Sequence, residues 1–147
     1  LWDYKTGSAR KFRQGDGIHN EGRIIQNILY LEMARKRLKS VHKGATIKSF
    51  GYFFPGLREH GERIKWTPAE LDHGKQIIAW LCEMLESGCF PTTDNDSDLW
   101  YSDYRPIHLD LGAEAEELHA KLKNPANRML LPFARLRELE FGGEINE

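Results

Sequence analysis

The chain has 147 residues, of which 40% are hydrophobic and 29% are charged, and its mean hydropathy is −0.59. These values are typical of a soluble globular protein with a single core. No apolar run approaches the ~18 residues that a membrane span requires, and no signal peptide is visible. The sequence therefore excludes a membrane protein and favours a cytoplasmic location.

Positive charge is concentrated in the first third of the chain. Residues 1–50 hold 11 Lys/Arg against 4 Asp/Glu, whereas residues 51–147 hold 10 against 18, and the whole chain has a net charge of −1. A basic half suits a polyphosphate partner, because neutralisation of phosphates supplies most non-specific affinity. A solvated helix face, such as residues 35–39, accounts for the same charges equally well.

The hydrophobic pattern predicts strands and helices in alternation from the first residue onward. A buried strand is expected over Leu1–Thr6, and a helix is expected over Glu21–Ser40. Two antiparallel strands are expected next, over Ala45–Pro55 and Glu62–Trp66, joined by a turn rich in Pro and Gly.

Helices dominate the prediction for the rest of the chain. A capping box with Pro at the first helical position predicts a helix over residues 67–87. Residues 88–112 are expected to be irregular and acidic. Two tail helices are expected after them, Glu114–Lys123 and Asn127–Glu140, and Pro132 should kink the second.

The element order predicts an α/β fold with an α+β tendency, in which helices flank a mixed sheet and a helical tail follows. We expect residues 1–112 to form the main domain and residues 113–147 to form the tail. The chain opens on Leu1, directly on a predicted strand, so we expect it to be part of a longer protein.

Four polar residues stand out near the start of the chain. Asp3 and Lys5 are two apart on a predicted strand and so project from one face, whereas Gln26 and Tyr30 are four apart on a predicted helix. A carboxylate beside an ammonium, followed by a Gln/Tyr stripe, is typical of metal-dependent phosphodiester hydrolysis. Plainer interpretations are a surface ion pair worth about 0–1 kcal/mol, a solvated glutamine and a core tyrosine.

The motifs that contain these residues are more specific than the residues alone. Asp3–Gly7 reads D-Y-K-T-G, and Gln26–Tyr30 reads Q-x-x-x-Y. Together they resemble the RecB/AddB-like branch of the PD-(D/E)XK nuclease superfamily, and the similarity extends to about Ile107. The resemblance implies a restriction-endonuclease-like core in residues 1–112.

The resemblance also implies a function. It implies Mg²⁺- or Mn²⁺-dependent hydrolysis of DNA phosphodiester bonds by a helicase–nuclease type repair or recombination protein. Asp3 would be a metal ligand, and Lys5, Gln26 and Tyr30 would be catalytic. The implied partners are DNA and a helicase domain or subunit.

Two features depart from that family. Its upstream aspartate and earlier helical acid or histidine have no counterpart here, and one carboxylate is a poor anchor for Mg²⁺, so we expect this chain alone to be inactive. Many relatives also carry cysteines that contribute to an iron–sulfur cluster. The matching positions here are Leu99, Ser102 and His108, so no cluster is expected.

These departures leave two other interpretations open. One is a catalytically degenerate nuclease-fold domain that binds DNA or a helicase partner, and the other is a structural module whose tail helices dock a neighbour. Zinc binding is disfavoured, because the His and Cys residues lack zinc-ligand spacing. Cys82 and Cys89 are expected to be free thiols.

Overall fold

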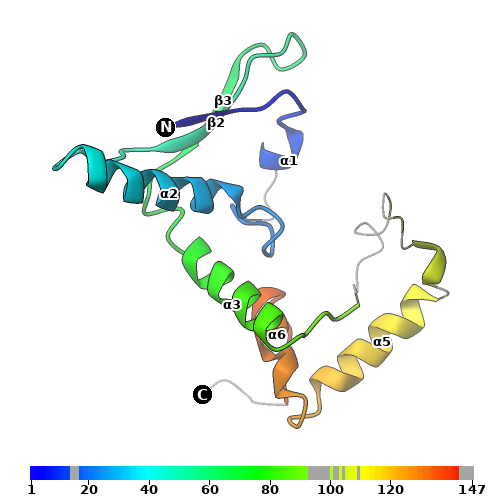
Figure 1. Ribbon diagram of the computed structural model, residues 1–147. Helices are drawn as coiled ribbons and strands as arrows, with labels where there is room; N and C mark the ends of the chain where they lie inside the picture. Colours follow the sequence, from blue (N-terminus) through cyan, green and yellow to red (C-terminus); the bar gives the residue numbers. More distant parts are fainter. Residues whose placement is uncertain (14–16, 93–99, 101–102, 104, 109, 143–147) are drawn as a thin grey trace. The chain divides into compact units, whose positions relative to one another are not determined.

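The computed structural model describes residues 1–13, 17–92, 100, 103, 105–108 and 110–142. Contacts divide the chain into two compact units, Leu1–Ala79 and Trp80–Glu147 (Figure 1). The first unit has 15 Lys/Arg and 8 Asp/Glu, whereas the second has 6 and 14. The charge asymmetry of the sequence is therefore a difference between the two units: the first is basic and the second is acidic. The predicted boundary at residue 112 marks the expected end of the nuclease-like domain, which a division by contacts does not test. It stays a prediction.

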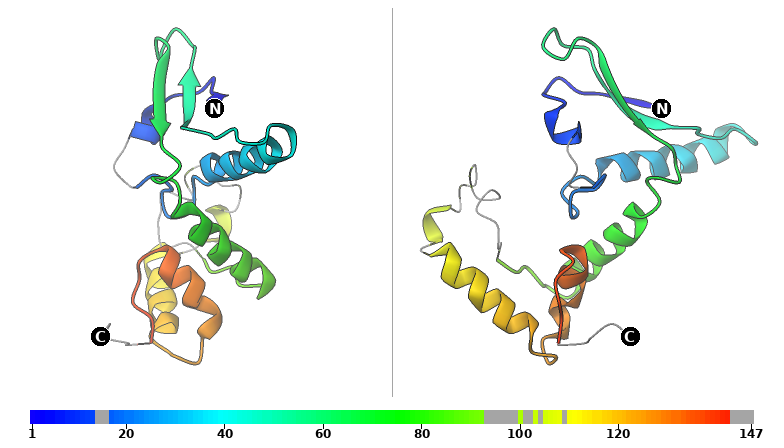
Figure 2. Two further views of the ribbon diagram at one scale, coloured as in Figure 1. Left: turned by 90° about the vertical axis from the view of Figure 1, so that its left-hand side faces the viewer. Right: turned by 180° about the vertical axis from the view of Figure 1, so that it is seen from behind.

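A mixed sheet forms the centre of the first unit. Its strands are β1 (Trp2–Tyr4), β2 (Phe50–Phe54) and β3 (Glu62–Trp66), in the order β1-β2-β3. β1 pairs with β2 in parallel, and β2 pairs with β3 antiparallel. The parallel pair requires a crossover, which contains the helix α2 (Gln26–Val41) (Figure 2). The predicted α/β class and mixed sheet are confirmed, and the element order differs from the prediction by one short additional helix over Arg10–Arg13.

One face of the sheet carries the core of the first unit. β2 buries Phe50, Tyr52 and Phe54 completely, and α2 contributes Ile28 and Leu31 to the same cluster. Alternate residues of β2 point to this face because side chains in a strand alternate with a period of two. The short helix α1 (Arg10–Arg13) covers the face too, since the ring of its Phe12 lies 4.6 Å from that of Tyr52.

Several sequence predictions for the first unit need correction. The strand predicted over Ala45–Pro55 covers only Phe50–Phe54. The strand predicted over residues 1–6 is shorter and is not buried: Trp2 is 41% exposed and Tyr4 is 69% exposed. The helix predicted to start at Glu21 starts at Gln26, because Asn20 and Glu21 adopt left-handed backbone angles with φ of 42° and 49°. Such angles end any right-handed helical run.

The capping box of the next helix forms, but the regular helix starts later than predicted. The carboxylate of Glu70 accepts hydrogen bonds from the backbone N–H and the hydroxyl of Thr67, at 2.6 and 2.7 Å. A series of turns follows, and α3 begins only at Gly74 and runs to Glu86. Gly74 is buried against His19 and Ile28, so the packing there excludes any side chain.

The second unit is helical. It contains the C-terminal part of α3, a 3₁₀ turn η1 (Arg105–Ile107), α5 (Leu111–Leu122), a second turn η2 (Arg128–Leu130) and α6 (Leu131–Leu136). Its core gathers buried side chains from the loop after α3, from α5, from η2 and from α6: Cys89, Leu118, Leu122, Leu130, Phe133 and Ala134.

The tail helices differ from the prediction at their ends. α5 starts three residues early, because the carboxylate of Asp110 caps it by accepting from Ala113 N–H at 3.1 Å. The second predicted helix is shorter, and Pro132 does not kink it. Pro132 lies in the first turn of α6, where the missing N–H of proline costs no hydrogen bond. No helix in the described parts of the chain is long and apolar enough to cross a membrane.

Candidate functional site

Pairing with β2 sets the direction of the β1 side chains. Asp3 lies opposite Tyr52 in the parallel register, and Lys5 extends the ladder by donating its N–H to Phe53 O at 2.9 Å. Asp3 and Lys5 therefore share the face of Tyr52, and Trp2 takes the other face, over Gly51. The predicted division of β1 into two faces is confirmed.

Asp3 and Lys5 form an ion pair on this face. Lys5 Nζ lies 2.9 Å from Asp3 Oδ2, and each side chain is 22% exposed. The pair has ionic rather than hydrogen-bond geometry, because the buried Oδ2 receives no hydrogen bond from the described residues. Lys5 Nζ also lies 4.8 Å from the centre of the Tyr52 ring, within the range of a cation–π contact.

Gln26 joins the strand to the helix. Lys5 Nζ donates a hydrogen bond to Gln26 Oε1, and Gln26 Nε2 lies 2.9 Å from the hydroxyl of Tyr30, to which it donates. Gln26 is the first residue of α2, and Tyr30 lies one turn later on the same side. The structure thus brings together all four residues that the sequence singled out: Asp3, Lys5, Gln26 and Tyr30.

Tyr52 belongs to this group, although the sequence did not point to it as a site residue. It is fully buried beneath Lys5, and its hydroxyl has no hydrogen-bond partner in the part of the chain that the structure describes. Burial raises the pKa of Tyr52, and the negative charge of Asp3 raises it further. The phenol is therefore neutral at physiological pH and free to donate a hydrogen bond.

A cleft of about 790 Å³ opens beside Lys5 and Gln26. Its cationic lining residues come from four segments: Lys5 after β1, Arg10 on α1, Arg23 before α2 and Arg58 after β2. No acidic side chain is found among its described lining residues. The cleft is therefore suited to an anionic ligand.

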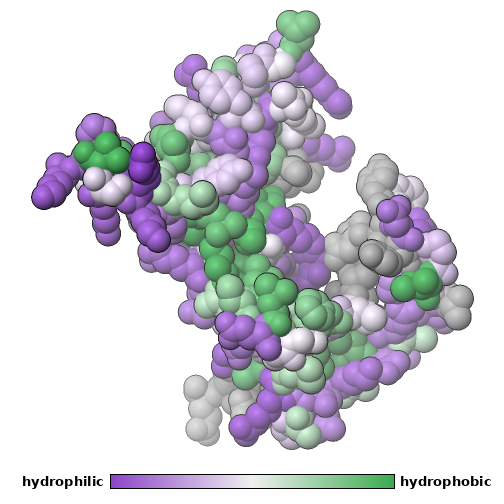
Figure 3. Space-filling view, viewed as in Figure 1, coloured by the Kyte–Doolittle hydropathy of each residue, from purple (hydrophilic) through white to green (hydrophobic). Residues whose placement is uncertain are grey.

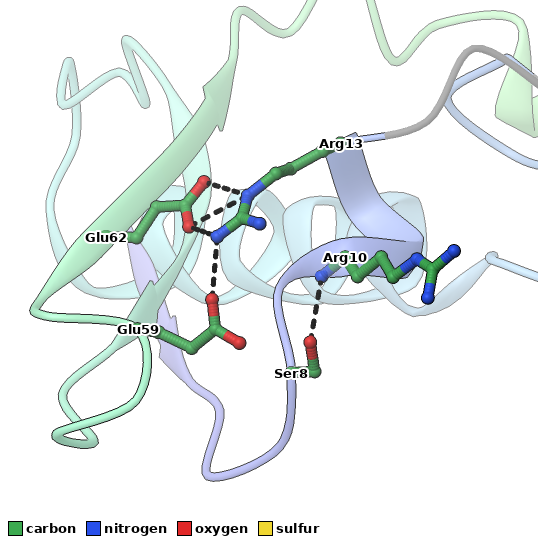
Figure 4. A network of polar contacts seen from close by, with 5 residues as sticks. All are labelled: Ser8, Arg10, Arg13, Glu59 and Glu62. Atoms are coloured by element: carbon green, nitrogen blue, oxygen red, sulfur yellow. Dashed lines mark hydrogen bonds and ion pairs between the residues drawn. The ribbon is translucent and has the colours of Figure 1, made fainter.

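A cluster of charges that the sequence did not reveal links α1 to the β2–β3 hairpin (Figure 4). Arg13 of α1 contacts Glu59 in the β2–β3 connection and Glu62 at the start of β3: its Nη2 lies 2.7 Å from Glu59 Oε2, and its Nε lies 2.7 Å from Glu62 Oε1. The Ser8 side chain, the Ala9 backbone and Arg13 favour the ionised form of Glu59 and so lower its pKa. The cluster fixes α1 against the hairpin.

The donors present fit a divalent metal ion only in part. Asp3 offers a carboxylate group, whose buried Oδ2 lies 2.9 Å from the ammonium of Lys5, and hard divalent ions prefer oxygen ligands. Over the described residues, no three His, Cys, Asp or Glu side chains gather into a metal-binding group. Among the described residues, Asp3 therefore supplies a single ligand.

The positions relevant to an iron–sulfur cluster are described only in part. Leu99 and Ser102 lie outside the described residues. His108 Nδ1 lies 2.6 Å from Glu114 Oε2, so this histidine has a structural partner in the second unit.

Comparisons with protein-family models, with curated proteins and with solved structures found no match to this chain.

Proposed function

We propose that this chain carries the lysine-bearing strand and the glutamine/tyrosine helix of a metal-dependent nuclease that hydrolyses DNA phosphodiester bonds. The supporting observation is the unbroken series of polar contacts from Asp3 through Lys5 and Gln26 to Tyr30. The two motifs that carry the resemblance to RecB/AddB-like nucleases are therefore adjacent and in contact. We assign the first unit to a restriction-endonuclease-like core on the same ground.

Lys5 would act on the developing negative charge of the reaction. Its ammonium is held by Asp3 on one side and by Gln26 on the other, so its position is fixed before a substrate arrives. A fixed cation beside a phosphoryl oxygen stabilises the transition state more than the ground state, because negative charge grows on that oxygen. Tyr30 positions Gln26 by accepting the hydrogen bond of its amide group.

Asp3 would hold Mg²⁺ or Mn²⁺ through its carboxylate group, whose Oδ2 also pairs with Lys5. When bound, such an ion supplies an activated water molecule at neutral pH. Further oxygen ligands are required, and in this proposal they come from the DNA phosphate, from water and from other segments of the full-length protein. The protein would work in the cytoplasm with a helicase domain or subunit in DNA repair or recombination.

Cleavage of linear DNA by the full-length protein tests this function. With Mg²⁺ or Mn²⁺ present, Lys5→Ala and Asp3→Asn should each lower the cleavage rate by at least about 100-fold. Lys65→Ala is the matched control, because Lys65 is an exposed lysine on the opposite face of the same sheet. Retained cleavage in both Lys5→Ala and Asp3→Asn would contradict the proposal.

The second candidate is a catalytically degenerate nuclease-fold domain that binds DNA or a helicase partner. It is favoured by the single carboxylate at the site, since one ligand holds Mg²⁺ poorly. In that case the full-length protein would bind DNA in a salt-dependent way, and neither metal ion would produce cleavage.

A further inference from the structure

The start of α2 lacks the side-chain cap that usually fixes the first turn of a helix. Its N-cap residue is Ile25, which makes no side-chain hydrogen bond, and its first turn holds no acidic residue. Gln26, the first residue of this helix, nevertheless holds the ammonium of Lys5. Another part of the chain must therefore fix the place of Gln26.

The turn that precedes Gln26 has a strained backbone. Three residues in succession, Asn20, Glu21 and Gly22, have positive φ angles of 42°, 49° and 85°. Asn20 and Glu21 carry side chains, which disfavour this left-handed region. Such a backbone costs free energy and persists only where the contacts around it fix its shape, which is common at functional sites.

His19 supplies contacts of this kind from inside the turn. Its carbonyl oxygen accepts hydrogen bonds from the N–H groups of Gly22 and Ile24, both at 3.0 Å. Its ring Nδ1 lies 3.2 Å from Ile24 O, and because a carbonyl oxygen can only accept, Nδ1 carries the proton. His19 thus binds both the N–H and the C=O of Ile24, which lies two residues before Gln26.

The ring of His19 is also held from its other side. It is 5% exposed, and a Cβ at Gly74 would lie 2.6 Å from its Cε1 and 2.8 Å from its Nε2. Nε2 is buried and has no hydrogen-bond partner among the described residues, so Nδ1 and close packing orient the ring. Because Gly74 has no side chain, His19 can join the turn before α2 to the start of α3.

We propose that His19 is a positioning residue of the candidate site. By holding the strained turn against α3 it fixes the first residue of α2, and Gln26 in turn fixes the ammonium of Lys5. The part of this proposal that concerns catalysis rests on the proposed nuclease function. His19 is not among the described lining residues of the cleft, so its effect on the reaction passes through Gln26.

Two substitutions separate the hydrogen bond of His19 from its bulk. The amide nitrogen of asparagine takes nearly the position of Nδ1, so His19→Asn keeps a donor for Ile24 O. The amide nitrogen of glutamine reaches further, to the position of Nε2, so His19→Gln removes that donor and keeps a polar side chain. His42→Gln is the control, because His42 is an exposed histidine directly after α2, whose far end is crowded with hydrophilic side chains at the left of Figure 3.

Cleavage of linear DNA by the full-length protein, with Mg²⁺ or Mn²⁺ present, measures the effect on the reaction. His19→Gln should lower kcat at least about 10-fold, because a small displacement of Gln26 and Lys5 weakens their action on the developing charge. KM should change less than about threefold, since His19 does not touch the substrate. His19→Asn and His42→Gln should keep kcat within about threefold of the unchanged protein, because the hydrogen bond to Ile24 O stays.

A double-mutant cycle tests the route through Gln26. Gln26→Ala removes the group that His19 is proposed to position, so adding His19→Gln to it should lower kcat further by less than about threefold. If His19 supported only the fold, His19→Gln would lower kcat by the same factor in both backgrounds. Equal factors, or a loss in His19→Asn as large as that in His19→Gln, would overturn the proposal.

NMR of side-chain nitrogens gives a readout that needs no cleavage. In isotope-labelled full-length protein, His19 should show the Nδ1–H tautomer, and the side-chain amide signal of Gln26 should move in His19→Gln but not in His42→Gln. If circular dichroism shows that His19→Gln fails to fold, the tautomer decides: a proton on Nδ1 supports the proposal and a proton on Nε2 overturns it. If the unchanged protein cleaves no DNA, the nuclease function fails by itself, and the Gln26 signal still decides whether His19 positions this residue.

Discussion

Asp3 and Tyr52 lie opposite each other in the parallel register of β1 and β2, and each has a buried oxygen that no described residue satisfies by a hydrogen bond. Buried polar atoms without partners are uncommon, because such an atom loses the hydrogen bonds that it makes with water in the unfolded chain and gains none in the folded protein. The charge of Asp3 Oδ2 is offset by its ion pair with Lys5 at 2.9 Å, so the Tyr52 hydroxyl is the group of this pair that lacks a partner among the described residues and is open to a further contact.

Tyr52→Phe tests this relationship. Removal of an unsatisfied buried hydroxyl should raise the free energy of unfolding by about 1 kcal/mol, since the ring still packs and the desolvation cost disappears. In the same variant, DNA cleavage should fall, because phenylalanine has no hydroxyl group to donate a hydrogen bond. Urea unfolding measures the free energy of unfolding, and the cleavage assay with linear DNA measures the activity. A loss of stability would show that the hydroxyl has a structural partner.

The ion pair of Asp3 and Lys5 predicts a specific pattern in a double-mutant cycle. Lys5→Met leaves a carboxylate that is only 22% exposed without its cation, so it should destabilise the fold. Adding Asp3→Asn should recover part of the loss, and the coupling energy between the two sites should be about 1 kcal/mol. Urea unfolding of the four proteins measures it. Strict additivity would mean that the two charges do not interact.

Gly51 predicts a packing constraint on β1. A Cβ at this position would lie 2.6 Å from the carbonyl oxygen of Ile64 and 2.6 Å from Cζ3 of Trp2. Because the first of these atoms is backbone, Gly51→Ala must displace a strand and should cost about 1–3 kcal/mol. Gly56→Ala is the control, as nothing lies within 4 Å of a Cβ there. Equal unfolding midpoints for the two variants would contradict the close approach of Trp2.

The hydrophobic pattern of the sequence predicted which helices and strands form better than it predicted where each one begins and ends. The bounds of β3 match the prediction, since Glu62–Trp66 alternates polar and apolar residues and needs no distant partner to be recognised. The start of α2 was misplaced, because the apolar period continues backward through Ile24 and Ile25, while the turn is set by the backbone angles of Asn20 and Glu21. Tertiary packing overrides helical propensity at that point.

The candidate site was predictable in part for a related reason. Asp3, Lys5, Gln26 and Tyr30 lie in two short motifs whose internal spacing is visible in the sequence. Tyr52 and the arginines of the cleft come from segments that approach the four residues only because the strands of the sheet pair. Alternation along a strand shows which face a residue is on, but it does not show which strand lies next to it. The pairing of Asp3 with Tyr52 across 49 positions follows from the register alone.

The contacts of Arg13 predict an acid-dependent loss of stability. Hydrogen bonds from Arg13 hold the pKa of Glu62 below its usual range, and Ser8, Ala9 and Arg13 do the same for Glu59. A carboxyl group with a lowered pKa in the folded state stabilises the fold above its unfolded pKa, and this stability is lost as the pH falls through the folded value. The free energy of unfolding should therefore decline below about pH 4.5, and Arg13→Met should flatten the decline. An unchanged pH profile in that variant would show that other carboxylates cause it.

The two cysteines predict a difference in reactivity that reports on the core of the second unit. Cys82 is exposed on α3, whereas Cys89 is 2% exposed and packs with Leu118 and Phe133. Burial raises the pKa of the Cys89 thiol, and the thiolate is the form that reacts with alkylating reagents. Iodoacetamide at pH 8 should therefore label Cys82 at least about 10-fold faster than Cys89, as followed by mass spectrometry of tryptic peptides. Urea should remove the difference, because unfolding exposes both thiols, and equal rates in the native protein would contradict the packing of Cys89 against α5 and α6.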